Sequence, residues 1–355
     1  MIAMERYFRM LAKLNASDLH LAAGRVASYR ASGKVQEVEG EAPLEDATLR
    51  EMLAEVVDKK DWNAFSHEHD LDFAYQLEGV GRFRGNYYEQ GNGVGCVFRL
   101  IPEEIIPYEK LGLPDIVSTL SDLDSGLVLV TGPTGSGKST TLASIVDLIN
   151  RKHARHIVTI EDPVEFVHQN KKSVLSHREV GKHTDSFASA LKAAIREDAD
   201  VVLVGEMRDH ETISLAIEAA GMGILVFGTL HTSSAAKTID RIIDAFPADQ
   251  QDQVRGTLSE SLYAVVAQVL CRRIGGGRIG IHEILIREKG LAGAIREAAP
   301  GSIASIIGAG RGRGMQTLDD ALGDALKAGH IEGREAYMKA NDKKRFQEFA
   351  EADSD

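Results

Sequence analysis

The stretch TGPTGSGKSTT, residues 131–141, decides the fold class of this chain. Residues 132–139 match the pattern G-x-x-x-x-G-K-[ST] in full, with an apolar run before them and a helical pattern after them. Glycines let such a loop turn its N–H groups toward phosphate oxygens, and the N-terminus of the following helix adds partial positive charge. The sequence therefore predicts a nucleotide-binding loop formed by Gly132, Pro133, Thr134, Gly135, Ser136, Gly137, Lys138, Ser139 and Thr140.

Two side chains of this loop have specific tasks in the predicted site. Lys138 would neutralise oxygens of the β- and γ-phosphates, and the Ser139 hydroxyl would ligate Mg²⁺. The predicted cofactors are therefore ATP and Mg²⁺, with Ser139 as the metal ligand.

From about residue 116 onward, short apolar runs rich in β-branched residues alternate with helical segments. The runs are GLVLV, HIVTI, DVVLVGE and ILVFGTLHT. Continuous apolar strands separated by helices are typical of a parallel sheet that is covered on both faces. Beyond these runs, a helix is predicted over residues 254–270, because apolar residues recur at helical spacing at Val254, Leu258, Leu262, Val265 and Val269.

The first hundred residues have a different pattern of helix and strand signals, which predicts a small α+β domain. Residues 4–14 have the spacing of an amphipathic helix, with apolar positions at Tyr7, Met10, Leu11 and Leu14. Strands are predicted in SDLHLAA, in a hairpin that turns at Ser32-Gly33, and within residues 71–90. Prolines at 102, 107 and 114 disfavour regular structure and place a linker at 102–115. The polar residues KKRFQEFAEADSD predict a frayed tail.

Net charge, cysteine content and hydropathy argue against a nucleic-acid-binding, secreted or membrane-spanning protein. The formal net charge of −12 argues against a general affinity for nucleic acid, so no nucleic-acid partner is expected. Cys96 and Cys271 have neither disulfide nor metal spacing, which suits a reducing compartment. No apolar run reaches the roughly 18–20 residues that span a bilayer, and no signal-peptide pattern is present. A cytoplasmic protein is therefore expected.

Polar residues follow three of the predicted strands. TIEDPVE (159–165) supplies three carboxylates, DADVVLVGEMRD (198–209) ends its strand at Glu206, and FGTLHT (227–232) presents His231. Gly205 stands where an aspartate usually precedes the glutamate, so one expected Mg²⁺ ligand is missing. Each strand end alone could merely be solvated, but three in one phosphate-loop domain indicate a shared site for hydrolysis.

These segments resemble motifs of one family. TIEDPVE resembles the aspartate box of the secretion ATPase superfamily, REDADVVLVGEMRD its atypical Walker B motif, and FGTLHTSSAAKTIDRIIDAFP its histidine box. HREVGKHTDSF, GGGRIGIHEILI and GMQTLD are similar to the PilT-like group of type IV pilus ATPases. The resemblance runs through nearly the whole chain, including SDLHL and GRFRGNYY in the first domain.

The resemblance implies an α/β fold in two parts. A PAS-like α+β domain would occupy residues 1–101 and a RecA-like P-loop ATPase domain with a mainly parallel sheet residues 116–340, with the linker between them and a polar tail over 341–355. It also implies a catalytic set, namely Glu206, Glu165, His231, Arg82 and Arg84.

Three further arginines fall in family motifs. Arg196, Arg208 and Arg241 would contact phosphate or an interface, or pair with acids such as Asp198 and Asp209. The sequence leaves both readings open.

The family's members are hexameric motors, which implies a homo-oligomer that works on an inner-membrane pilus platform to drive retraction and twitching motility. A second pilus ATPase is a further implied partner, and the implied location is cytoplasmic, at the inner face of the cytoplasmic membrane. Two segments depart from the family: GLAGAIRE (290–297) replaces AIRNLIRE, and AGMGI (220–224) replaces AETGH. These departures keep open an accessory or regulatory ATPase subunit, and a nucleic-acid translocase is a more distant alternative.

Overall fold

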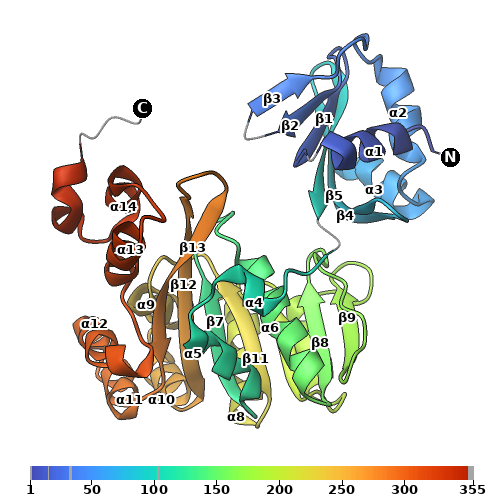
Figure 1. Cartoon of the computed structure of the whole chain (residues 1–355). Coiled ribbons are helices and arrows are strands. Elements are labelled where there is room, and N and C mark those ends of the chain that lie inside the picture. Colours follow the sequence, from blue (N-terminus) through green and yellow to red (C-terminus); the bar gives the residue numbers. More distant parts are fainter. Residues whose placement is uncertain (1, 15, 32–33, 102–103, 351–355) are drawn as a thin grey trace. The chain divides into compact units, whose positions relative to one another are not determined.

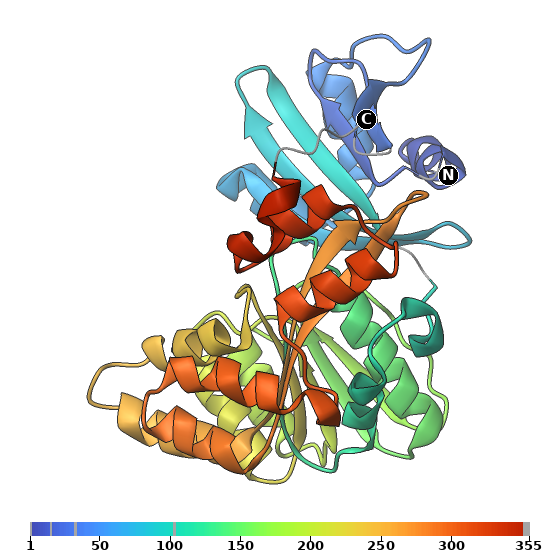
Figure 2. The ribbon, with the colours of Figure 1, turned by 60° about the vertical axis from the view of Figure 1, so that its left-hand side comes forward.

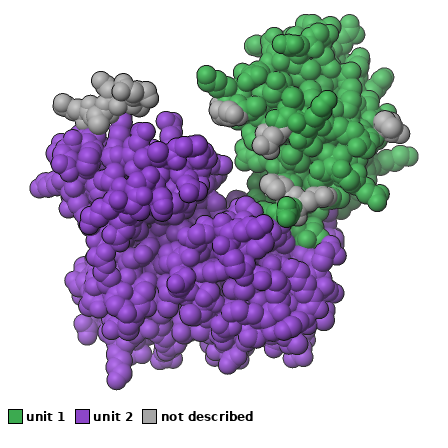
Figure 3. Space-filling view, in the orientation of Figure 1, with its two compact units in different colours: residues 1–104, 163–167 green, residues 105–162, 168–355 purple. Residues whose placement is uncertain are grey.

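The structure is a computed structural model that describes residues 2–14, 16–31, 34–101 and 104–350. The chain forms two compact units (Figure 3). Unit 1 comprises Met1–Glu104 and Pro163–Val167, and unit 2 comprises Ile105–Asp162 and His168–Asp355. Within the described part of the chain, no helix is long and apolar enough to cross a membrane.

Unit 1 is built on an antiparallel sheet with strand order β3-β2-β1-β6-β5-β4. The strands are β1 Asp18–Ala22, β2 Ser28–Ala31, β3 Lys34–Glu37, β4 Asp70–Leu77, β5 Gly81–Gln90 and β6 Gly93–Ile101. The helices are α1 Glu5–Leu14, α2 Asp46–Ala54 and α3 Lys59–Glu68 (Figure 1).

The predicted elements of unit 1 are present. Helix α1 buries Tyr7, Phe8 and Leu11, and the Phe8 ring packs 4.3 Å from that of Phe83 on β5. Strands β2 and β3 form the predicted hairpin, whose turn at Ser32-Gly33 lies outside the described residues. The apolar face of α1 thus closes the aromatic core over the sheet.

The proline-containing stretch leads into unit 2 through short helical elements, where the sequence predicted a linker. They are α4 Tyr108–Leu111, α5 Asp115–Ser118 and η1 Thr119–Asp122, while residues 102–103 lie outside the described part. Pro107 and Pro114 occupy the N-cap positions of α4 and α5, where their missing N–H is not needed.

Unit 2 contains a seven-stranded sheet with the order β13-β12-β7-β11-β10-β8-β9. Every neighbouring pair is parallel except β12 with β13, so the predicted mainly parallel α/β domain is confirmed. Its strands are β7 Gly126–Thr131, β8 His156–Glu161, β9 Val174–Glu179, β10 Val201–Val204, β11 Leu225–Leu230, β12 Leu262–Arg272 and β13 Arg278–Ile286.

Helices cover both faces of this sheet, as Figure 2 shows with the green α6 on one side and the yellow and orange helices on the other. They are α6 Lys138–Lys152, α7 Phe187–Ala194, α8 His210–Gly221, α9 Ala235–Asp244, α10 Gln251–Ser261, α11 Lys289–Arg296, α12 Pro300–Ala309, η2 Arg311–Arg313, α13 Leu318–Lys327, α14 Gly333–Lys339 and η3 Lys343–Phe349. Successive residues of β11 enter opposite cores: Val226 packs in the cluster that includes residues of α7–α12, and Phe227 packs in the cluster that includes residues of α6.

The predicted helix over residues 254–270 is wrong in its second half. Helix α10 ends at Ser261, and Leu262 begins β12, which lies between β7 and β13. A strand buried on both faces is apolar at nearly every position, so its residues also satisfy a helical spacing. Neighbouring strands, rather than local periodicity, select the extended conformation here.

The prediction of a frayed tail over residues 343–355 is wrong for its first part, and residues 351–355 lie outside the described residues. Residues Lys343–Phe349 form η3, and Phe346 is buried in a cluster with Val269 and Cys271 of β12 and residues of α13 and α14. Phe346, the partly buried Phe349 and the 2.7 Å hydrogen bond from Arg345 to Asp320 hold this polar segment on the domain.

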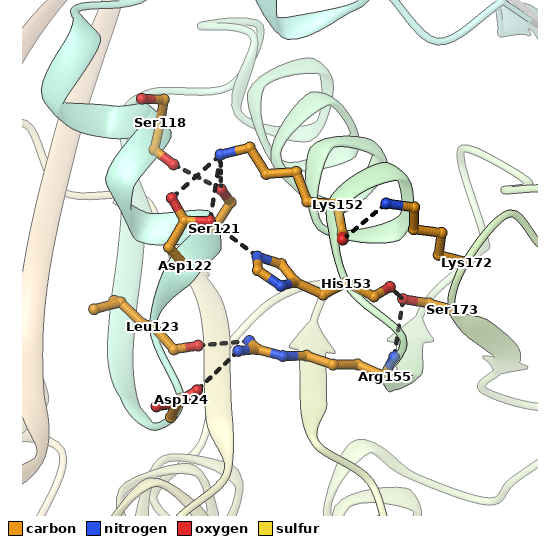
Figure 4. A network of polar contacts seen from close by, with 10 residues as sticks. All are labelled: Ser118, Ser121, Asp122, Leu123, Asp124, Lys152, His153, Arg155, Lys172 and Ser173. Carbon is orange, nitrogen blue, oxygen red and sulfur yellow. Dashed lines mark hydrogen bonds and ion pairs between the residues drawn. The ribbon is translucent and has the colours of Figure 1, made fainter.

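Ion pairs fasten the segment before β7 to the end of α6 that is farther from the phosphate loop (Figure 4). Lys152 Nζ donates to both carboxylate oxygens of Asp122, and His153 Nε2 lies 2.9 Å from Asp122 Oδ1. Arg155 donates to the Leu123 carbonyl and, at 2.9 Å, to Asp124. The hydrogen bond from His153 and the charge of Lys152 hold the pKa of Asp122 below its usual value despite some desolvation. This network anchors the entry to the P-loop strand.

Candidate nucleotide-binding site

The predicted phosphate loop lies between β7 and α6 and has a backbone that depends on glycine. Gly132 has φ +146° and Gly137 has φ +88°. A Cβ atom on Gly132 would lie 2.2 Å from the Gln268 carbonyl oxygen and 2.6 Å from Ser136 Oγ. The loop can therefore pass this close to β12 only because residue 132 lacks a side chain.

Two polar groups of the loop are poised for an anion. The Ser136 hydroxyl is buried and has no hydrogen-bond partner among the described residues, an arrangement that costs free energy unless a ligand satisfies it. Lys138 Nζ donates to the carbonyl oxygens of Gly132 at 2.9 Å and Pro133 at 3.2 Å, so its ammonium group is folded over the loop. With the N-terminus of α6 following directly, this chemistry fits the phosphates of a nucleotide.

The loop and the other predicted acid and base residues of unit 2 share one edge of the sheet. In the parallel register Thr131 pairs with Leu230, and Val204 pairs with both Gly228 and Ile160. The chain therefore continues from neighbouring strand ends into the phosphate loop, into His231 and into Glu206. As the sequence predicted, the carboxyl ends of β7, β11, β10 and β8 meet here.

Glu206 is held between two nitrogen-bearing side chains. Arg208 Nη2 lies 2.6 Å from Glu206 Oε2, and His231 Nε2 lies 3.0 Å from Glu206 Oε1. Burial alone would raise the pKa of Glu206, but the hydrogen bond from Arg208 and the contact with His231 outweigh it and lower this pKa. Glu206 is therefore a carboxylate at neutral pH. Of the two readings left open for Arg208, the structure shows pairing with an acid, namely Glu206 rather than Asp198 or Asp209.

The departure at Gly205 has a steric reason. A Cβ atom at residue 205 would lie 3.2 Å from the Ile160 carbonyl oxygen and 3.3 Å from Glu161 Cα on the adjacent strand β8. The Gly205 N–H donates to that Ile160 carbonyl at 2.8 Å, and its own carbonyl accepts a hydrogen bond from the Thr229 hydroxyl. An aspartate in this position would push β10 away from β8, so glycine preserves the strand contact.

Arg82, Arg84 and Glu165 belong to unit 1. Arg82 Nε donates to the Val164 carbonyl at 2.8 Å, within the residues 163–167 that group with this unit. Arg84 lies 3.7 Å from Asp72 on β4, and both side chains are about half exposed. The three residues are thus placed in unit 1, whereas the phosphate loop, Glu206 and His231 are placed in unit 2.

Sequence reasoning missed a buried glutamine beside the loop. Gln268 of β12 donates through Nε2 to the Ser136 carbonyl at 2.5 Å and accepts through Oε1 from the Thr141 hydroxyl at 2.9 Å. The only signal in the sequence is a single amide within the apolar run LYAVVAQVLC, whose helical spacing predicts a helix. The predicted loop also ended at Thr140, one residue before this contact.

Ser139, the predicted Mg²⁺ ligand, is exposed at the first turn of α6, where its hydroxyl is open to a metal ion carried by a nucleotide. Among the residues that the structure describes, no group of three His, Cys, Asp or Glu side chains could hold a metal ion by itself. A site of the P-loop type needs no such group, because the phosphates supply most of the ligands.

Comparisons with known proteins identify the family of this chain. The family model described as "Type II/IV secretion system protein" matches residues 96–276. "Type IV pilus retractation ATPase PilT" of Pseudomonas aeruginosa is 47% identical over 329 residues, which cover 93% of this chain and 95% of that protein. "Type IV pilus ATPase PilU" of the same organism is 37% identical over 338 residues, covering 95% and 88%.

A solved structure resembles the whole chain. The "Crystal Structure of the Pilus Retraction Motor PilT and Bound ADP" has a TM-score of 0.90 and 42% identity and covers 98% of this chain and 99% of that one. The predicted family resemblance is confirmed. The chain therefore belongs to the type II/IV secretion system protein family, within its PilT-like group.

Proposed function

We propose that this chain is a motor ATPase that hydrolyses Mg-ATP as a hexameric ring and drives retraction of a type IV pilus through an inner-membrane platform protein. The observation that carries the proposal is the shared sheet edge, where a phosphate loop with an unsatisfied Ser136 hydroxyl, the ionised Glu206 and the imidazole of His231 follow the ends of neighbouring strands. The 47% identity to a pilus retraction ATPase over 93% of the chain supports the biological role.

The side chains divide the work of hydrolysis. Loop N–H groups, Lys138 and Ser136 bind and orient the phosphates. Mg²⁺ at Ser139 would offset charge on the phosphate oxygens. Glu206 orients the attacking water and accepts its proton, and the lowered pKa of Glu206 means that its side chain is ionised at neutral pH. Arg208 and His231 each contact one oxygen of this carboxylate, and each oxygen keeps a second lone-pair site that can accept a hydrogen bond from the water.

Residues of unit 1 complete the site in this proposal. Arg82 and Arg84 contact the nucleotide of a neighbouring subunit, and Glu165 acts as a second acid. A guanidinium group supplied across an interface binds phosphate oxygens in a bidentate way and links hydrolysis to movement of the domains. The ring works at the inner face of the cytoplasmic membrane, and a second pilus ATPase is a further partner.

The test mixes two inactive variants. Lys138→Ala lacks its own phosphate contact but keeps its arginines, whereas Arg84→Ala lacks the arginine and keeps its phosphate loop. We choose Arg84 because its 3.7 Å pair with Asp72 is exposed and contributes little to folding, whereas Arg82 also donates to a backbone carbonyl. Mixed rings should regain a fraction of wild-type ATPase activity, because one subunit supplies what its neighbour lacks.

Specific activity of the wild type should also rise with protein concentration as rings assemble. Mixtures as inactive as the separate variants would refute the shared site. Glu206→Gln should bind ATP without hydrolysing it, and normal turnover in that variant would remove Glu206 from the catalytic role.

A second candidate is an accessory ATPase that depends on a partner motor. The 37% identity to PilU over 95% of the chain and the altered segments at 220–224 and 290–297 favour it. Intact ATP binding with negligible turnover, restored by a second pilus ATPase, would support this candidate over the autonomous motor.

A further inference from the structure

We propose that Gln268 is a positioning residue that holds the phosphate loop in its nucleotide-binding conformation. The inference rests on the proposed nucleotide site, to which Gln268 belongs without touching the phosphates. It begins with the register of β12 on β7, whose last pair is Ala267 with Thr131. Gln268 is the next residue of β12 and therefore lies beside the point where the chain leaves β7 and enters the loop.

The amide of Gln268 bridges two parts of the loop region. Its Nε2 donates to the Ser136 carbonyl at 2.5 Å, in the middle of the loop, and its Oε1 accepts from the Thr141 hydroxyl at 2.9 Å, in the first turn of α6. Gln268 and Thr141 are each 3% exposed. Hydrogen bonds between buried partners are costly to break, because a broken bond leaves an unsatisfied polar group.

The same residue also confines the loop sterically. The Gln268 carbonyl oxygen would lie 2.2 Å from a Cβ atom on Gly132, and its Nε2 would lie 3.1 Å from one on Gly137. Backbone and side chain of one residue thus contact the loop at its start, middle and end. This three-point contact fixes the peptide orientation around Ser136, whose unsatisfied hydroxyl belongs to the predicted phosphate site.

At this position only an amide or a protonated carboxyl group supplies both a donor to the Ser136 carbonyl and an acceptor for the Thr141 hydroxyl. In Gln268→Leu both hydrogen bonds are lost at nearly unchanged volume. In Gln268→Glu the protonated side chain can still donate to Ser136 and accept from Thr141, whereas the ionised one cannot donate. Burial raises the pKa of such a carboxyl group, so it titrates within an accessible pH range.

The facing titratable residue does not obscure this measurement. His282 of β13 is registered opposite Gln268, and burial lowers its pKa to about 4, so it stays neutral above pH 5.5. Lys138, which donates to the Gly132 carbonyl, is present in every variant compared, so its contribution cancels.

The experiment measures ADP binding to the full-length protein by isothermal titration calorimetry between pH 5.5 and 8.5. Gln268→Leu should weaken binding about tenfold, the equivalent of one hydrogen bond, at every pH. Gln268→Glu should bind like the wild type at low pH and lose affinity as the pH rises through its carboxyl pKa. The control is Val269→Ala, which truncates the next residue of β12 in the separate cluster with α13 and α14 and should lower stability while leaving ADP affinity unchanged.

The outcomes separate this inference from the proposed function. If the wild type does not bind ADP, the nucleotide site itself is wrong. If the wild type binds and Gln268→Leu binds equally well, or no worse than Val269→Ala, Gln268 has no positioning role. A Gln268→Glu variant whose carboxyl group ionises between pH 5.5 and 8.5 and whose affinity still parallels that of the wild type would also overturn the inference, because the donor to Ser136 would then be unnecessary.

Discussion

Replacement of Gly132 by alanine tests how tightly the phosphate loop is enclosed. The added Cβ atom would lie 2.2 Å from a backbone oxygen of Gln268, and at φ +146° an L-residue is strained in any case. Strain of about 1–3 kcal/mol and overpacking of about 1–3 kcal/mol add to a loss of about 4 kcal/mol in the free energy of unfolding. The backbone carbonyl cannot rotate aside as a flexible side chain could.

Gly135 supplies the matched control in the same loop. Its φ is +76°, but a Cβ atom there would meet no atom within 4 Å. Gly135→Ala should therefore cost only the backbone term, about 1 kcal/mol. The difference between the two variants, about 3 kcal/mol, reports the contact with β12 together with the greater backbone strain at φ +146°.

Urea unfolding followed by far-UV circular dichroism measures both variants. Trp62, the only tryptophan of the chain, lies in unit 1, so its fluorescence reports that unit in the same samples and should stay unchanged. Equal unfolding midpoints for Gly132→Ala and Gly135→Ala would refute the argument, because the close approach of Gln268 would then carry no energetic weight.

Three further predictions follow from individual contacts. Arg208→Ala removes the hydrogen bond that lowers the pKa of Glu206, so the acidic limb of the pH–rate profile should move to higher pH; an unmoved limb contradicts the pairing. Burial, with the nearby His177, lowers the pKa of His168 from 6.5 to about 4, so stability is lost as pH falls through this window. Between pH 6.5 and pH 4, the free energy of unfolding should fall by about 3 kcal/mol less in His168→Gln than in the wild type, as measured by urea titrations at the two pH values. An equal fall in both proteins refutes the assignment. Asp209→Ala removes the N-cap of α8, bonded to the Thr212 N–H at 2.8 Å, and should lower the unfolding free energy by about 1 kcal/mol.

The altered segment GLAGAIRE keeps its place in the fold. It lies mostly within α11, which buries Leu291, Ala294 and Ile295, and Arg296 Nε donates to Ser259 of α10 at 2.9 Å. The buried apolar side chains and this hydrogen bond hold α11 on the domain. The segment that replaces AIRNLIRE therefore still forms a helix. The segment differs from AIRNLIRE at the buried positions Leu291 and Ala294 as well as at the exposed Gly290, so the change reaches the packed face of α11 and its surface.

The sequence by itself determined the nucleotide loop, the mainly parallel sheet and the family. These features follow from local patterns, because a glycine-rich loop needs its residues at set spacings and buried parallel strands are apolar throughout. Glu206 and His231 were also predictable, since a strand places the residue that follows it at the sheet edge. For these residues, order along the chain already implies position in space.

Only the tertiary structure decided what surrounds these residues. Residues 262–270 became a strand because β7 and β13 flank them, against their helical spacing. Gln268 meets Ser136 and Thr141 across 132 and 127 residues of chain, and no local pattern encodes a contact between such distant segments. The pairing of Glu206 with Arg208 and His231, and thus its low pKa, likewise depends on the arrangement of β10 and β11. A motif specifies which groups are present, whereas packing specifies their partners and hence their ionisation and rigidity.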